Sequence, residues 1–187
     1  MIFATTPSQT VGPYFSIGLP FDIGPYAVPP DTPGAIRITG TVYDGEGVPV
    51  PDHLLEFWQA DRGGRFADMH GHGGPSELPG FRGFARYGIE DGDGTFEIVT
   101  VKPGPVPGLR EAVQAPHIDV SVFARGMLNR CVTRIYFADE PERNAADPVL
   151  NTVPAARRAT LLAQPVDGGY RFDIHLQGSE ETVFFSV

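Results

Sequence analysis

Apolar and polar residues alternate in several short runs of this chain, a pattern typical of β-strands. In the run 117–123, aliphatic residues hold every second position, and His117 and Asp119 hold positions between them. Successive side chains of a strand point to opposite faces, so one face suits a core and the other carries a histidine and a carboxylate. These two side chains form either half of a metal site or a polar pair on a cleft wall. The polar pair is favoured, because two ligands do not make a metal site.

Further runs predict the rest of a β-rich fold. Strands are expected at 35–44, 54–60, 95–101, 131–137, 170–176 and 183–187. The second of these contains Trp58, the only tryptophan, and is expected to pass through the core. Residues 154–163 form the predicted helix, with Pro154 in its first turn. Short strands separated by turns, without a βαβ rhythm, predict an all-β sandwich of two packed sheets with one or two short helices.

Two segments depart from this pattern. Residues 5–34 form a proline-rich arm that is too apolar for a solvated tail, so we expect it to lie on its own domain or on a neighbouring chain, with a neighbour favoured for part of it. Residues 61–87 are rich in glycine and are expected to form a long loop, which contains His70 and His72. A flexible polar loop is the favoured interpretation of these histidines, because flanking glycines leave them without a preorganised geometry.

Composition narrows the class of protein. The 187 residues carry a net charge of −9, which argues against binding to nucleic acid or to an anionic membrane surface. The single cysteine, Cys131, excludes an intramolecular disulfide and fits a reducing cytoplasm. We see neither a signal peptide nor an apolar run long enough to span a membrane, so we expect a cytoplasmic protein. Without a repeat or a domain boundary, we expect one domain over 1–187, with 1–34 as its arm.

Several motifs, taken in order, resemble one known family. They are the segments 6–14, 40–44, 56–60, 101–105, 116–118 and 134–137, and together they cover nearly the whole chain. Each motif is weak alone, but their order and spacing are specific. On these residues the chain resembles the intradiol ring-cleaving dioxygenases. This resemblance implies the β-sandwich of that family and an oxygen-dependent cleavage of a catechol between its two hydroxylated carbons.

The resemblance also implies where a metal would be bound. The family holds Fe(III) through two tyrosinates and two histidines, and the matching positions here are Phe66, Val106, His117 and Asp119. Three of the four ligands are therefore replaced, and phenylalanine and valine have no donor atom. A ferric tyrosinate centre cannot be built from this chain alone, so we expect no metal and no catalytic residue in it. His117 and Asp119 are then expected to form a hydrogen-bonded pair at the floor of an empty cavity.

This departure resembles the alpha subunits of the family, which pair with a homologous iron-binding beta subunit in a large alpha/beta assembly. The implied substrate is the small aromatic acid protocatechuate. Thr10, Gly12 and Tyr14 match positions that approach the substrate in the beta site, and Arg134 matches a position on the pocket wall. An arginine there suits the substrate carboxylate, but a salt bridge is an equal alternative. Whether Arg134 faces the beta site or a vestigial alpha cavity stays open.

Two other functions are weighed against this one. The chain could be a stand-alone sandwich that binds a small ligand near His117 without catalysis. It could also be a self-sufficient metalloenzyme that uses His70, His72, His117 and Asp119, which are ligand types for zinc or Fe(II). The match of motifs along the chain favours the subunit over both.

Overall fold

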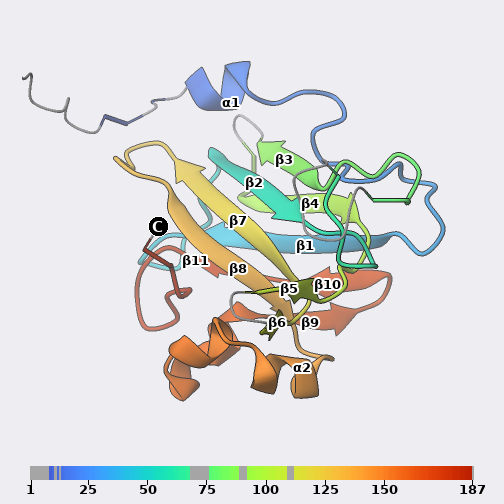
Figure 1. The fold of residues 1–187 in the computed structure, drawn as a ribbon. Coiled ribbons are helices and arrows are strands. Elements are labelled where there is room, and N and C mark those ends of the chain that lie inside the picture. The colour runs from blue at the N-terminus through green and yellow to red at the C-terminus, as the bar shows by residue number, and fades with distance from the viewer. Residues whose placement is uncertain are drawn as a thin grey trace, which may run out of the picture.

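The computed structural model describes residues 9–10, 12, 14–67, 76–88, 92–108 and 112–186, and its strands stack in two layers (Figure 1). In chain order the elements are α1 (Tyr14–Gly18), β1 (Ile36–Tyr43), β2 (His53–Gln59), β3 (Phe84–Gly88), β4 (Thr95–Thr100), β5 (Val106–Pro107), β6 (Val113–Gln114), β7 (His117–Ala124), β8 (Cys131–Phe137), α2 (Pro141–Ala146), the 3₁₀ helices Leu150–Thr152 and Ala155–Leu161, β9 (Leu162–Val166), β10 (Gly169–Arg171) and β11 (Ile174–His175).

The strand order gives the two layers of a sandwich. One layer is the antiparallel series β3-β2-β7-β8, and the other contains β4, β1, β10 and β9, with β11 beside the end of β1. Strand β9 turns the corner between them, because its first residues pair with β8 and its last residues pair with β10. The prediction of an all-β sandwich of two packed sheets with one or two short helices is confirmed.

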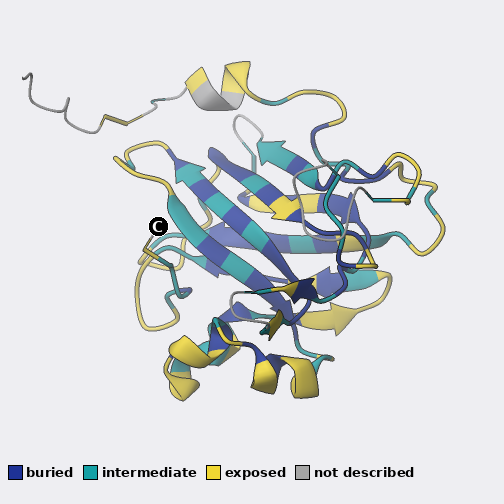
Figure 2. Ribbon diagram, in the orientation of Figure 1, coloured by how far each residue is buried: buried dark blue, intermediate teal, exposed yellow. Residues whose placement is uncertain are grey.

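The core lies between these layers and explains the alternation along β7, which Figure 2 shows as alternating buried and half-buried positions. Ile118 and Phe57 from one layer pack in one cluster with Ile38 and Ile98 from the other. Strand β1 needs Gly40 at its centre, because a Cβ atom there would lie 1.8 Å from the carbonyl oxygen of Phe172. The two layers therefore depend on buried aliphatic and aromatic faces and on one close backbone approach.

The strand predicted at 54–60 passes through the core as expected, because Leu55 and Phe57 of β2 are buried there, but Trp58 itself is 38% exposed. It shares the outer face with Asp119, its partner across the strands, while Phe57 takes the inward position. The glycine-rich loop is also shorter than expected, because residues 84–88 form β3 and pair with β2.

Three predictions near the C-terminus also require correction. The segment 154–163 is a 3₁₀ helix over Ala155–Leu161, not an α-helix, and β9 begins directly after it. The strand expected at 170–176 is split into β10 and β11, because the Asp173 carboxylate, and not a backbone carbonyl, accepts the hydrogen bond of the Thr41 amide at 2.9 Å. The described residues 183–186 form no strand, although the Phe185 amide bonds the Val132 carbonyl at 2.7 Å.

The arm has two parts in the described residues. Residues 24–28 pack on their own domain: the Ala27 amide donates to the Val99 carbonyl, and Ala27 and Val28 are buried. The preceding part is exposed and carries α1, where Tyr14 is 71% and Ile17 is 58% exposed. Figure 1 shows α1 and α2 at opposite ends of the sandwich. Neither these helices nor any other helix in the described segments is long and apolar enough to cross a membrane.

Candidate functional site

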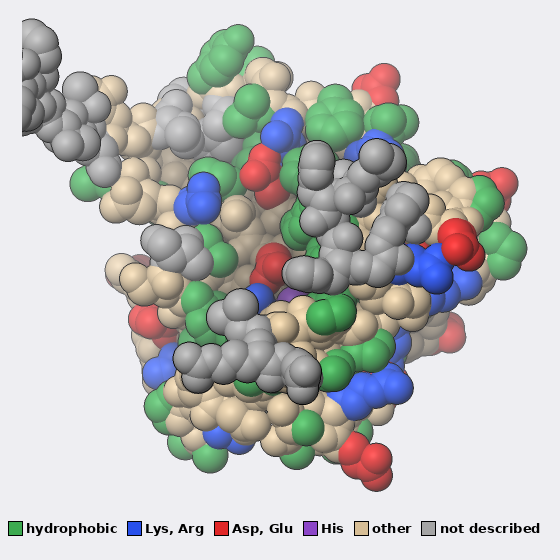
Figure 3. Space-filling view, viewed as in Figure 1, with side chains coloured by type: hydrophobic (Ala, Val, Ile, Leu, Met, Phe, Trp, Pro, Cys, Tyr) green, Lys and Arg blue, Asp and Glu red, His purple; other side chains and the backbone are tan. Residues whose placement is uncertain are grey.

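The candidate site lies on the outer face of the β3-β2-β7-β8 layer. Trp58 of β2, Asp119 of β7 and Arg134 of β8 are direct neighbours across the strands, and His117 lies opposite Tyr136. Figure 3 shows this face, with acidic, basic and histidine side chains together in a hollow near its centre. The pairing of the strands thus gathers side chains that lie far apart in the sequence.

The two positions without a donor atom border the same region. The Phe66 ring stacks on Trp58, with ring centroids 6.0 Å apart and planes 8° apart. Val106 is buried in β5 and lies opposite Gln114 of β6. A cleft of about 350 Å³ opens beside Val106, and Gly64, whose positive φ lets the chain pass close to the Pro105 carbonyl, also lines it. The aromatic stack and the short β5-β6 hairpin therefore form two apolar walls of the site.

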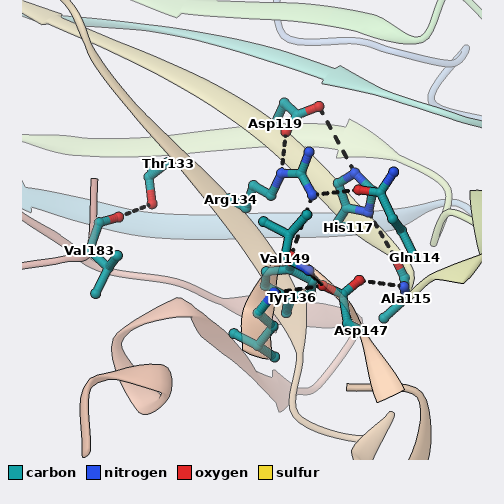
Figure 4. Close-up of polar contacts among 11 residues, drawn as sticks. Gln114, Ala115, His117, Asp119, Thr133, Arg134, Tyr136, Asp147, Val149 and Val183 are labelled. Atoms are coloured by element: carbon teal, nitrogen blue, oxygen red, sulfur yellow. Dashed lines mark hydrogen bonds and ion pairs between the residues drawn. The ribbon is translucent and has the colours of Figure 1, made fainter. Parts of the chain in front are cut away.

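The polar centre of the site is an ion pair between Arg134 and Asp119 (Figure 4). Nε of Arg134 lies 2.8 Å from Oδ1 of Asp119, and its Nη1 donates to Oε1 of Gln114 at 2.7 Å. His117 lies beside this pair, and its Nδ1 is 2.7 Å from the Ala115 carbonyl oxygen. The hypothesis of a hydrogen-bonded His117–Asp119 pair is wrong, because Nε2 and Oδ2 are 4.0 Å apart and Arg134 holds the carboxylate.

The positive charge of this cluster belongs to Arg134 and not to His117. Burial lowers the pKa of His117 below its ordinary value, and the Arg134 guanidinium lowers it further, against the opposing effect of Asp119. At neutral pH the imidazole is therefore neutral, and the Ala115 carbonyl selects the tautomer that carries its proton on Nδ1. The positive charge beside Asp119 comes from Arg134 alone, since arginine stays protonated in proteins.

A second carboxylate, Asp147, is connected to Arg134 through Tyr136. It was not predicted from the sequence. Asp147 is fully buried, and its Oδ1 accepts a hydrogen bond from the Tyr136 hydroxyl at 3.1 Å. The same carboxylate accepts backbone N–H groups of Ala115, Val149 and Leu150. Burial raises the pKa of the Tyr136 hydroxyl far above 10, so it stays a donor. Asp147 directly follows α2 and belongs to no recognisable motif. Its role is therefore visible only in the folded chain.

These residues do not fit a ferric tyrosinate centre. Phe66 and Val106 offer no donor atom, Asp119 is engaged by a guanidinium, and His117 is the one remaining donor of the four positions. Within the described segments no three His, Cys, Asp or Glu side chains are grouped so that they could hold a metal ion. His70 and His72, which the metalloenzyme hypothesis needs, lie outside the described residues.

The arm residues lie away from this cluster. The Thr10 hydroxyl accepts a hydrogen bond from the Gly126 amide at 3.1 Å, beyond the end of β7 that is opposite to His117. From Asp119 to Ala124, where β7 ends, the strand extends roughly 17 Å. Gly12 follows Thr10 with a φ of +64°, and α1 begins at Tyr14. The structure thus brings Phe66, Val106, His117, Asp119 and Arg134 together, and it does not bring Thr10, Gly12 and Tyr14 to them.

Comparison with known proteins gives the context of this site. A family model described as Dioxygenase matches residues 10–178. The chain is 47% identical over 200 residues to the protocatechuate 3,4-dioxygenase alpha chain of Burkholderia cepacia, covering 97% of each chain. It is 35% identical over 158 residues to the beta chain from the same organism, covering 79% of this chain and 66% of that one. A solved intradiol ring-cleavage dioxygenase from Tetranychus urticae shares the fold with a TM-score of 0.60 at 16% identity, covering 92% of this chain and 94% of the other.

Proposed function

This chain belongs to the intradiol dioxygenase family, and we propose that it is the alpha subunit, without an iron ion of its own, of a protocatechuate 3,4-dioxygenase. One observation carries the proposal: at the four ligand positions of an iron-dependent family, this chain has Phe66, Val106, His117 and an Asp119 that is paired with Arg134. Its similarity to alpha and beta chains alike supports pairing with a homologous beta subunit in an alpha/beta assembly.

In the proposed complex the beta subunit binds the Fe(III), which makes the catechol ring susceptible to O₂. The complex cleaves protocatechuate (3,4-dihydroxybenzoate) between its hydroxylated carbons and adds both oxygen atoms, giving 3-carboxy-cis,cis-muconate. The contribution of this chain is to shape and close the substrate pocket of its partner.

The arm is the proposed point of contact with that pocket. Tyr14 and Ile17 expose apolar side chains that a monomer has no reason to keep in water. Thr10 carries a hydroxyl group that a polar ligand could contact. We therefore assign Thr10, Gly12 and Tyr14 to the beta pocket, and residues 24–34 to this chain's own sandwich.

Arg134 has a different proposed place. Its guanidinium is held by Asp119 and Gln114 of the same chain, and its side chain is only 19% exposed. A carboxylate of a substrate in the partner's pocket would have to compete with these contacts. We therefore propose that Arg134 lines the cavity of this chain and does not face the beta site.

A second candidate function is a stand-alone binding module, and the cleft of about 350 Å³ beside Val106 is the observation in its favour. The two functions differ in what the purified chain does alone. A binding module should be soluble and monodisperse without a partner, whereas an obligate subunit should aggregate or require one.

The decisive experiment is co-expression with a homologous beta chain, followed by metal content and oxygen uptake on protocatechuate for each chain alone and for both together. The proposal expects this chain alone to be free of iron and inactive, and the complex to hold about one iron ion per pair and to consume oxygen. Iron and turnover in this chain alone would overturn it. A soluble chain that neither binds the beta chain nor holds iron would favour the binding module.

A further inference from the structure

A guanidinium group lies beside the position where relatives with a complete ligand set carry a metal ion. Asp119 and His117 occupy two of the four ligand positions, and Nε of Arg134 lies 2.8 Å from Oδ1 of Asp119. The other oxygen of Asp119 points toward His117 Nε2 at 4.0 Å (Figure 4). The cationic side chain thus occupies the space that a metal ion bound to Asp119 would need.

The guanidinium is held there by a built network. Its Nη1 contacts Oε1 of Gln114 at 2.7 Å and lies 3.5 Å from the Tyr136 hydroxyl. Tyr136 is fully buried and donates to Asp147, which is itself fully buried and bonded to three backbone amides. Contacts from three strands and from the segment after α2 therefore fix the orientation of the Arg134 side chain. Because the side chain is already ordered, less conformational entropy is lost when it pairs with Asp119.

Arg134 is the cation that offsets the charge of Asp119. Asp119 is a carboxylate, and Nε of the Arg134 guanidinium lies 2.8 Å from its Oδ1. A divalent ion placed next to the guanidinium would meet repulsion in a partly buried setting, where screening is weak. Without the guanidinium, a neutral imidazole and a carboxylate would be two adjacent metal-binding groups.

We propose that Arg134 supplies from within the chain the positive charge that a metal ion supplies at this position in iron-binding members of the family, and that it thereby excludes metal ions from His117 and Asp119. At these positions the chain therefore has an ion pair with a structural role, in place of a metal site that has lost some of its ligands. This inference rests on family membership and on the geometry of the cluster, and it does not depend on the proposed alpha/beta pairing.

The test is a charge cycle in the full-length chain, prepared with its beta partner or alone if no complex forms. The variants are Arg134→Met, Asp119→Asn and the double variant, because methionine keeps the apolar stem and asparagine keeps the shape. Arg134→Met leaves a partly buried carboxylate without its cation, so we expect the midpoint of thermal unfolding to fall by roughly 3–8 °C. The double variant should regain most of this loss.

A matched control and a metal titration complete the experiment. Arg37 pairs with Glu97 on the exposed surface at 3.6 Å, so Arg37→Met should shift the midpoint by about 1 °C or less. Added Co²⁺ should raise the midpoint of Arg134→Met and leave that of the wild type unchanged. The inference is overturned if the double variant is less stable than Arg134→Met, or if Co²⁺ stabilises the wild type as much as the variant.

Discussion

Arg134 and Asp119 lie opposite each other on β8 and β7, with Nε of the guanidinium 2.8 Å from Oδ1 of the carboxylate. This pair replaces the hydrogen bond between His117 and Asp119 that the sequence suggested. It also connects the sheet to the β5-β6 hairpin through Gln114. A polar cluster on the outer face thereby joins β7 and β8 to this hairpin.

The stack of Phe66 on Trp58 is open to a spectroscopic test. Phe66→Ala removes the ring that covers the indole at 6.0 Å, so the emission of Trp58 should shift to longer wavelength. The loss of the stack should also cost about 1 kcal/mol of stability. Because Trp58 is the only tryptophan, fluorescence of the purified chain reports on this position alone. Phe21→Ala is the control, since Phe21 packs under Arg82 and Arg86 instead; an equal shift in both variants would contradict the assignment.

The sequence predicted those strands whose alternation reflects one buried face. β1, β4, β7 and β8 were placed within one or two residues, and the alternation is most regular in β7. The prediction failed where a side chain replaces the backbone in the ladder, as Asp173 does between β10 and β11. The alternation along β2 did not show that Trp58 lies on the outer face, opposite to the buried Phe57.

Gly40 tests the close approach between β1 and the segment after β10. Gly40→Ala would place a Cβ atom 1.8 Å from the Phe172 carbonyl oxygen, so we expect a loss of about 3 kcal/mol or more in the free energy of unfolding. Gly47→Ala is the control, because Gly47 has a φ of +77° but open space around it, and it should lose only about 1 kcal/mol. Urea denaturation measures both, and equal losses would argue against the close contact.

His53 predicts how stability depends on pH. Its ring is buried, Nδ1 bonds the Val50 carbonyl at 2.8 Å, and burial lowers its pKa below the ordinary value of 6.5. The folded chain therefore takes up this proton at lower pH than the unfolded chain does. The contribution of His53 to the free energy of unfolding should be complete above about pH 7.5. It should decrease as the pH falls through 6.5, and it should stop decreasing below the lowered pKa of the folded state.

The slope that His53 contributes is at most about 1.4 kcal/mol per pH unit. His53→Asn keeps a donor near Val50 but removes this proton, so the variant should lose less stability between pH 7.5 and 5.5 than the wild type loses. His117 acts in the same direction, so the slope should shrink without vanishing. Urea midpoints over this range measure it, and identical slopes in both proteins would refute the assignment.

Tyr14 tests the role of the arm. Its side chain is 71% exposed in this chain, so Tyr14→Ala should change the chain's own stability by less than about 0.5 kcal/mol. If the ring is buried against the beta subunit, the dissociation constant of the complex should rise roughly tenfold or more. Val166, 47% exposed on β9, is the control, and Val166→Ala should leave the affinity unchanged. Equal affinities for the Tyr14 variant and the wild type would remove Tyr14 from the interface.

The candidate site could be predicted only in part. The motifs located Phe66, Val106, His117, Asp119 and Arg134, which the sheet then brings together. The partners that hold them, Gln114 and Asp147, belong to no motif, and their roles depend on how β6 and the segment after α2 return to the sheet. Pairing between distant segments is a property of the folded chain, and alternation along one strand does not encode it.

The central claim is that this chain provides no iron ligand to the complex it forms. His117 is the one donor among the four ligand positions that is not already held by a cation, so His117→Gln tests the claim most directly. The measurement is the iron content per alpha/beta pair of the purified complex. We predict the same iron content as in the wild-type complex. Loss of iron from an intact His117→Gln complex would contradict the claim.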